Sequence, residues 1–163
     1  MNKIRYLGEN VNNPNLKSML QVRLLQLLSK ACADAFKRAG LATPEEIINK
    51  GITIASSPLL NDSSNNATLG ISESVRQRAA QSQAPAQTIR SQFTSNGPVI
   101  FFRAEAFYNT TYLDEAVAHK FIHAAGVDKF PVWGYSLGRG NDLSGYDHYH
   151  DMIDNCGYQN VSH

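Results

Sequence analysis

The chain has 163 residues, with fifteen basic and fourteen acidic side chains and a formal net charge of +1. This length fits a single domain that can bury a sizeable core, and the charges are spread along the chain without the basic cluster that nucleic-acid binding requires. No apolar run approaches the roughly 20 residues needed to span a bilayer, so we expect neither a nucleic-acid nor a membrane partner.

The first third of the chain predicts helices and one strand. Residues 1–14, rich in Asn, predict an irregular N-terminal arm, and residues 15–40 predict one long amphipathic helix that ends at a glycine. Residues 43–46 (Thr-Pro-Glu-Glu) have the pattern of a helix start, with threonine as the cap and glutamate three residues later. That short helix should stop at Gly51, and residues 52–55, of which the first three are β-branched, predict a strand.

The middle of the chain is more polar. Residues 61–68 have the composition of a surface loop. Residues 72–94 carry only a thin apolar stripe, which predicts partly exposed helical pieces broken at Pro85, or else a linker. Residues 99–102 (Val-Ile-Phe-Phe) are the strongest strand signal, and such an apolar run requires burial on both faces or under a helix.

A helix with two histidines is predicted at residues 114–126, where the final glycine ends it. Thr111, with an aspartate three residues later, has capping-box spacing. Positions i and i+4 lie on one face of a helix, so the imidazoles of His119 and His123 can converge on one point. This is the geometry of a two-histidine metal site, although such a pair also arises by chance on an amphipathic helix.

Residues 118–126 (Ala-His-Lys-Phe-Ile-His-Ala-Ala-Gly) resemble the His-Glu-x-x-His-x-x-Gly segment of zincin-type zinc metallopeptidases. Residues 99–102 are similar to the strand that runs beside the active-site helix of that fold, and residues 142–156 are more loosely similar. The resemblance implies a single zincin-like α+β domain over residues 1–163, with helices packed on a small β-sheet around the central histidine helix. It also implies zinc as cofactor and a peptide or protein as substrate.

Two lysines depart from the family pattern. Lys120 stands where the family has the glutamate that serves as general base, and an ammonium cannot accept a proton at neutral pH unless its pKa is greatly lowered. A cation beside the metal also opposes zinc binding. Lys129 occupies the family's third-ligand position and is unsuitable as a ligand. We therefore expect a metallopeptidase-like protein that is impaired or inactive, with zinc absent or weakly bound; the alternative is a non-catalytic binding or structural domain without metal.

A third metal ligand must then come from further along the chain. Asp142 is favoured because it follows a glycine-rich bend that could return the chain to the helix, although it could equally cap the last helix. His148 is the second choice, and His150 and Asp151 are further candidates. Side chains so close together on a helix point in several directions, so they cannot all meet one ion.

Two more side chains are expected near the metal. Glu115 lies one turn before His119, where it could orient the imidazole or substitute for the missing carboxylate. Tyr146 could stabilise an oxyanion, or it could pack in the core as part of a last helix expected at residues 144–156.

Cys32 and Cys156 are far apart and form no Cys-x-x-Cys motif, which argues against a thiolate metal site. They are either a disulfide that ties the first helix to the C-terminal segment or two buried free thiols. The disulfide would imply an oxidising compartment. Although the N-terminus shows no signal peptide, the protein is expected to be secreted or extracytoplasmic.

Overall fold

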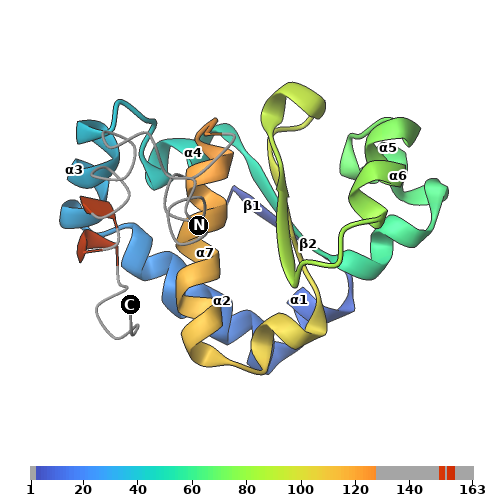
Figure 1. Cartoon of the computed structure of the whole chain (residues 1–163), viewed down its shortest axis with the longest axis horizontal. Helices are drawn as coiled ribbons and strands as arrows, with labels where there is room; N and C mark the ends of the chain where they lie inside the picture. Colours follow the sequence, from blue (N-terminus) through green and yellow to red (C-terminus); the bar gives the residue numbers. More distant parts are fainter. Residues whose placement is uncertain (1–2, 128–150, 153, 157–163) are drawn as a thin grey trace, which may run out of the picture.

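A computed structural model describes residues 3–127, 151–152 and 154–156. These residues form a single α+β domain built on a small mixed sheet, whose strand order is β1-β2-β4-β3 (Figure 1). Strands β1, β2 and β4 are parallel, and the edge strand β3 runs antiparallel to β4. The strands are β1 (Ile4–Leu7), β2 (Ile52–Ser56), β3 (Ala86–Ile89) and β4 (Val99–Phe102).

Helices cover both faces of the sheet (Figure 1). Helices α1, α2, α3, α4 and α7 contribute to the larger apolar cluster on one face, and α5 and α6 contribute to the smaller cluster on the other. The helices are α1 (Glu9–Asn12), α2 (Pro14–Leu27), α3 (Lys30–Arg38), α4 (Pro44–Lys50), α5 (Asn66–Leu69), α6 (Glu73–Ala80) and α7 (Thr110–Ala124).

The strand predicted at residues 99–102 is confirmed as β4, and all four of its residues are buried. Successive side chains of a strand point to opposite faces. Ile100 and Phe102 therefore pack into the larger cluster, whereas Val99 and Phe101 pack into the smaller one. Burial on both faces explains why this stretch is apolar at every position.

The irregular arm predicted at residues 1–14 is wrong for residues 4–12. Residues 4–7 form β1, which pairs in parallel with β2 so that Ile4 lies opposite Ile52. Gly8 then turns the chain tightly against β2: its φ is 94°, and a Cβ there would lie 2.6 Å from the Ser56 Cβ. A four-residue strand has too short a pattern to be recognised before its partner strand is known.

The single long helix predicted at residues 15–40 is two helices, α2 and α3. The break lies at Leu28 and Ser29, where the Ser29 hydroxyl accepts a hydrogen bond from the Cys32 N–H at 3.2 Å and caps α3. Serine favours such a cap over a position inside a helix, because its side chain competes for backbone hydrogen bonds. The change of direction lets Leu24 of α2 and Phe36 of α3 both reach the core.

The short helix predicted after Thr43 is confirmed as α4, with a complete capping box between Thr43 and Glu46. The strand that follows is confirmed as β2. Residues 72–94 are only partly as predicted, because α6 is followed after Pro85 by the strand β3. The predicted surface loop contains short helical turns and α5.

Candidate metal centre

Helix α7 carries the two histidines and lies beside the sheet, on the face of the larger cluster (Figure 1). Its N-cap lies two residues earlier than predicted, at Asn109, whose side-chain Oδ1 accepts a hydrogen bond from the Tyr112 N–H at 3.1 Å. The cap predicted at Thr111 is therefore wrong. The predicted end at Gly126 is correct: this glycine has a φ of 111°, and its N–H donates to the His123 carbonyl.

The imidazoles of His119 and His123 face each other, as their i and i+4 spacing predicts. Their Nε2 atoms are 3.1 Å apart, and their rings stack with centroids separated by 4.8 Å. The His123 Nδ1 lies 2.6 Å from the Val127 carbonyl oxygen. A carbonyl can only accept, so we assign the proton to Nδ1, which leaves the His123 Nε2 with a lone pair that accepts a hydrogen bond from the His119 Nε2–H. Binding of a metal by both Nε2 atoms would replace this hydrogen bond and would require the His119 proton to lie on Nδ1.

This arrangement meets two requirements of a zinc site. Two nitrogens at 2.0 to 2.1 Å from a tetrahedral zinc are about 3.3 Å apart, close to the 3.1 Å observed here. Ligand imidazoles must also be neutral. Burial, followed by the nearby Lys120 and His123, lowers the pKa of His119 to about 2, so this ring carries no charge at neutral pH.

Lys120 is placed between these histidines in sequence and is partly buried. Burial lowers the pKa of its ammonium group. Its backbone carbonyl accepts a hydrogen bond from the Thr88 hydroxyl of β3 at 3.2 Å, which ties α7 to the edge of the sheet. Glu115 lies one turn earlier on α7 and is half-buried.

The remaining predicted site residues lie mostly outside the described part of the chain. These are Asp142, Tyr146, His148 and His150. Within residues 3–127, 151–152 and 154–156, no third histidine, cysteine or carboxylate joins a group that could hold a metal. Asp151 is described, and its carboxylate instead accepts two hydrogen bonds from Arg38, each 2.7 Å long.

The strand beside α7 differs from the one that the sequence suggested. β4 lies inside the sheet, and the edge strand β3 makes the more extensive contact with α7. The Arg103 N–H donates to the Pro85 carbonyl, so these two residues are a hydrogen-bonded pair. Hydrogen-bonded and non-hydrogen-bonded pairs alternate along an antiparallel ladder. Thr88 and Ile100 are therefore a non-hydrogen-bonded pair, and the N–H and C=O groups of Thr88 point away from β4. The sequence did not predict β3 or its position at the edge of the sheet, where the Ala86 backbone bonds the Tyr112 side chain.

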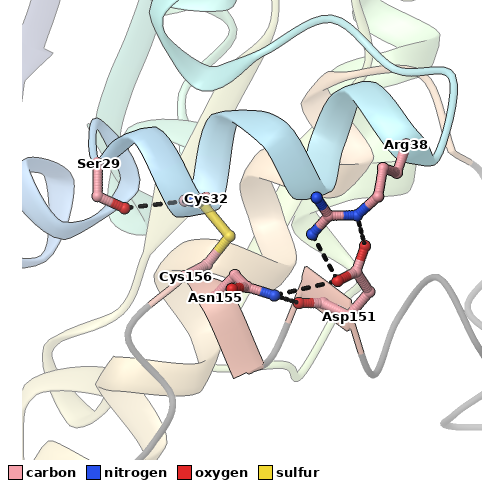
Figure 2. The surroundings of a disulfide bond; sticks show 6 residues. All are labelled: Ser29, Cys32, Arg38, Asp151, Asn155 and Cys156. Carbon is pink, nitrogen blue, oxygen red and sulfur yellow. Dashed lines mark hydrogen bonds and ion pairs between the residues drawn. A yellow bond between two sulfur atoms is a disulfide. The ribbon is translucent and has the colours of Figure 1, made fainter.

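A disulfide joins Cys32 of α3 to Cys156 (Figure 2). Beside it, the Asn155 side chain donates to the backbone carbonyl and carboxylate of Asp151, which is itself paired with Arg38. Of the two alternatives for the cysteines, the structure has the disulfide. The described C-terminal residues are thus held against α3.

No protein-family model, curated protein or solved structure matches this chain. Among the helices of the described residues, none is long and apolar enough to cross a membrane. Function is therefore inferred from the local geometry of α7, the edge of β3 and the disulfide.

Proposed function

We propose that this chain is a zincin-like metallopeptidase relative that binds zinc through His119 and His123, and that Lys120 impairs its hydrolytic activity. The observation that carries the proposal is the convergence of the two Nε2 atoms at 3.1 Å. The Val127 carbonyl supports it, because a hydrogen bond to the far nitrogen of a ligand imidazole fixes both its tautomer and its orientation.

The residues have distinct roles in this proposal. His119 and His123 hold the metal, with Asp142 as third ligand or His148 in its place. When bound, zinc supplies a Lewis acid that polarises a carbonyl and lowers the pKa of water. Lys120 is a cation where a peptidase needs a general base, so it cannot take up the proton that hydrolysis releases. Glu115 and Tyr146 keep their predicted roles beside the metal.

At Thr88 the edge of β3 is open, which favours an extended peptide as the bound molecule; at Ala86 the backbone of the same edge already bonds the Tyr112 side chain. The outward N–H and C=O groups of Thr88 find no hydrogen-bond partner among the described residues. An extended peptide can pair with such an edge through its own backbone. It would then run alongside α7, because the Thr88 side chain contacts the Lys120 carbonyl.

Zinc titration tests the metal site directly. Isothermal titration calorimetry of untagged protein with zinc, in a buffer that does not chelate, should show one site that is lost in His119→Ala and His123→Ala. Lys120→Gln and Lys120→Glu should both bind zinc more tightly, because both remove the cation. Only Lys120→Glu restores a general base, so it alone should cleave a peptide library.

The matched pair at residue 120 separates charge removal from base chemistry. Stoichiometric zinc binding by Lys120→Glu without cleavage of any peptide would contradict the peptidase assignment. Absence of zinc binding in the wild type and in both variants would contradict the metal site and favour the second candidate, a non-catalytic domain without metal. Lys120 favours that candidate, because a cation next to the histidine pair opposes metal binding.

Secretion is also part of this proposal. The disulfide is compatible with an oxidising, extracellular environment. The partner is a peptide or protein, and neither a nucleic acid nor a membrane is expected.

A further inference from the structure

A pocket of about 300 Å³ lies where the three parallel strands end. Its lining includes Asn10, which follows β1, Ser57, which directly follows β2, and Arg103, which directly follows β4. The carboxyl ends of these strands meet at one end of the sheet, because all three run in the same direction. We call this cavity the strand-end pocket, defined by Asn10, Ser57, Leu60, Arg103 and Glu105.

The chain leaves neighbouring strands toward opposite faces of the sheet at this end. After β1 and β4 it enters the larger cluster, through Val11 and Phe107, whereas after β2 it enters the smaller cluster, through Leu60 and Leu69. Figure 1 shows the result, with α5 and α6 on one side of the sheet and α7 on the other. In open α/β sheets, segments that diverge in this way leave a crevice outside the carboxyl ends of the strands, where ligands bind.

The lining carries two opposite charges side by side, on Arg103 and Glu105. The Arg103 Nη1 lies 3.9 Å from the Glu105 Oε1, which is too far for a hydrogen bond. The Arg103 Nη2 donates to the Ser82 carbonyl at 2.7 Å, which fixes the guanidinium, and the buried Nε has no hydrogen-bond partner among the described residues. The two side chains are 32% and 51% exposed, so both charges remain accessible to a ligand.

We infer that the strand-end pocket binds a free α-amino acid with an apolar side chain. Such a ligand carries its carboxylate and its ammonium group on one carbon atom, so its two charges can face Arg103 and Glu105 together. The guanidinium can donate charge-assisted hydrogen bonds to the ligand carboxylate, and the Glu105 carboxylate can accept them from the ammonium group. An anion alone would be repelled by Glu105 and a cation alone by Arg103, which favours a ligand with both charges.

The rest of the lining suits the remaining atoms of such a ligand. Ser57 and Asn10 provide uncharged polar groups, and Leu60 and Ala79 provide apolar surface for the ligand side chain. The volume is at the lower limit of ligand sites, which is about 300 Å³, so a small molecule fits better than a peptide.

This pocket is separate from the histidine pair. Ala124, at the histidine end of α7, lines a different pocket together with Gly51 and Pro98, which directly precede β2 and β4. The histidine end of α7 therefore lies near the amino ends of these strands, whereas the strand-end pocket lies at their carboxyl ends. Amino-acid binding there requires neither a metal nor peptidase activity.

An NMR titration of isotope-labelled, metal-free protein tests the inference; metal is removed because free amino acids also chelate zinc. The probes are leucine, N-acetylleucine, which lacks the ammonium charge, and leucinamide, which lacks the carboxylate. Leucine should cause saturable shifts of the backbone amides that line the strand-end pocket, with a Kd of about 0.1 to 1 mM for a ligand of this size. Each analogue should bind about three- to tenfold more weakly, as expected for the loss of one partly exposed ion pair.

Two charge variants assign the preferences to their residues. Glu105→Gln should bind leucine and N-acetylleucine equally, and Arg103→Gln should bind leucine and leucinamide equally. The matched controls Glu45→Gln and Lys37→Gln remove the same charges from exposed positions outside the pocket and should keep both preferences. Because the Glu105 side chain is half exposed, Glu105→Gln remains a valid test even if Arg103→Gln does not fold.

Four results would overturn the inference: no saturable shift with leucine up to about 10 mM, equal binding of the three probes to wild type, shifts confined to amides outside the strand-end pocket, or an unchanged preference for leucine over N-acetylleucine in Glu105→Gln. Failure of the proposed metal site is distinguishable from these results. His119→Ala combined with His123→Ala should lose zinc binding and keep leucine binding, and loss of leucine binding in that variant would contradict a separate site.

Discussion

Removal of the disulfide should be the most destabilising change outside the sheet. Cys32 and Cys156 are buried and separated by 124 positions. In the chain-entropy description, a bridge that closes a loop of this length reduces the freedom of the unfolded chain by about 5 kcal/mol at 25 °C. Total stabilities of domains are typically about 5 to 15 kcal/mol, so this loss would remove a large part of the stability.

The assay is urea unfolding followed by far-UV circular dichroism, with Cys32→Ala combined with Cys156→Ala. Alanine is used instead of serine, because a serine at either buried position would leave a hydroxyl without a hydrogen-bond partner. The free energy of unfolding should fall by about 3 to 5 kcal/mol, because the measured stabilisation by a disulfide is often smaller than the chain-entropy estimate. A decrease below about 1 kcal/mol would refute the reasoning, as would two reactive thiols on alkylation of the unreduced, denatured wild type.

Three further predictions test the described structure. Asn109→Ala should lower the free energy of unfolding by about 1 kcal/mol and Thr111→Ala by much less, because only Asn109 caps α7. Denaturant unfolding of both variants measures this difference, and an equal loss in the two would contradict the assigned cap. Phe101→Ala should cost about 3 to 5 kcal/mol in the same assay, since this side chain is fully buried in the smaller cluster; a loss below about 1 kcal/mol would contradict that burial. Hydrogen bonds from Arg76, Asn66 and Gln77 lower the pKa of Glu73 from 4.5 to about 2. The stability contributed by this carboxylate is therefore present above about pH 4.5 and is lost as the pH falls toward 2. An NMR titration of its side-chain carboxyl should show the low value, and Arg76→Gln should raise it; an unchanged value in the variant would contradict the pairing.

Features that depend on neighbouring residues in the chain could be predicted from the sequence. The capping box of α4 uses Thr43 and Glu46, three residues apart, and both of its hydrogen bonds are present. The convergence of His119 and His123 likewise requires only the helical period and a helix that continues past His123, as α7 does to Ala124. The run at residues 99–102 was recognisable because burial on both faces makes every position apolar.

Features that depend on distant residues could not be predicted in the same way. β1 and β3 have four residues each and are stabilised by their pairing with β2 and β4. Such short segments carry no periodic signal of their own that outweighs the surrounding polar sequence. Cys32 and Cys156 can form a disulfide only if α3 and the C-terminal segment lie in contact. Their positions in the sequence, 124 residues apart, do not show whether these two segments meet.

The structure separates the placement of the histidines from the chemistry of Lys120. Helix α7 is held by the Asn109 cap, by buried side chains such as Phe121, and by the bond from Thr88 to a backbone carbonyl. None of these contacts uses the Lys120 side chain. Its substitution should therefore leave the histidine geometry intact, so changes in zinc affinity or hydrolysis at this position would report the charge and basicity of residue 120 rather than a rearranged fold.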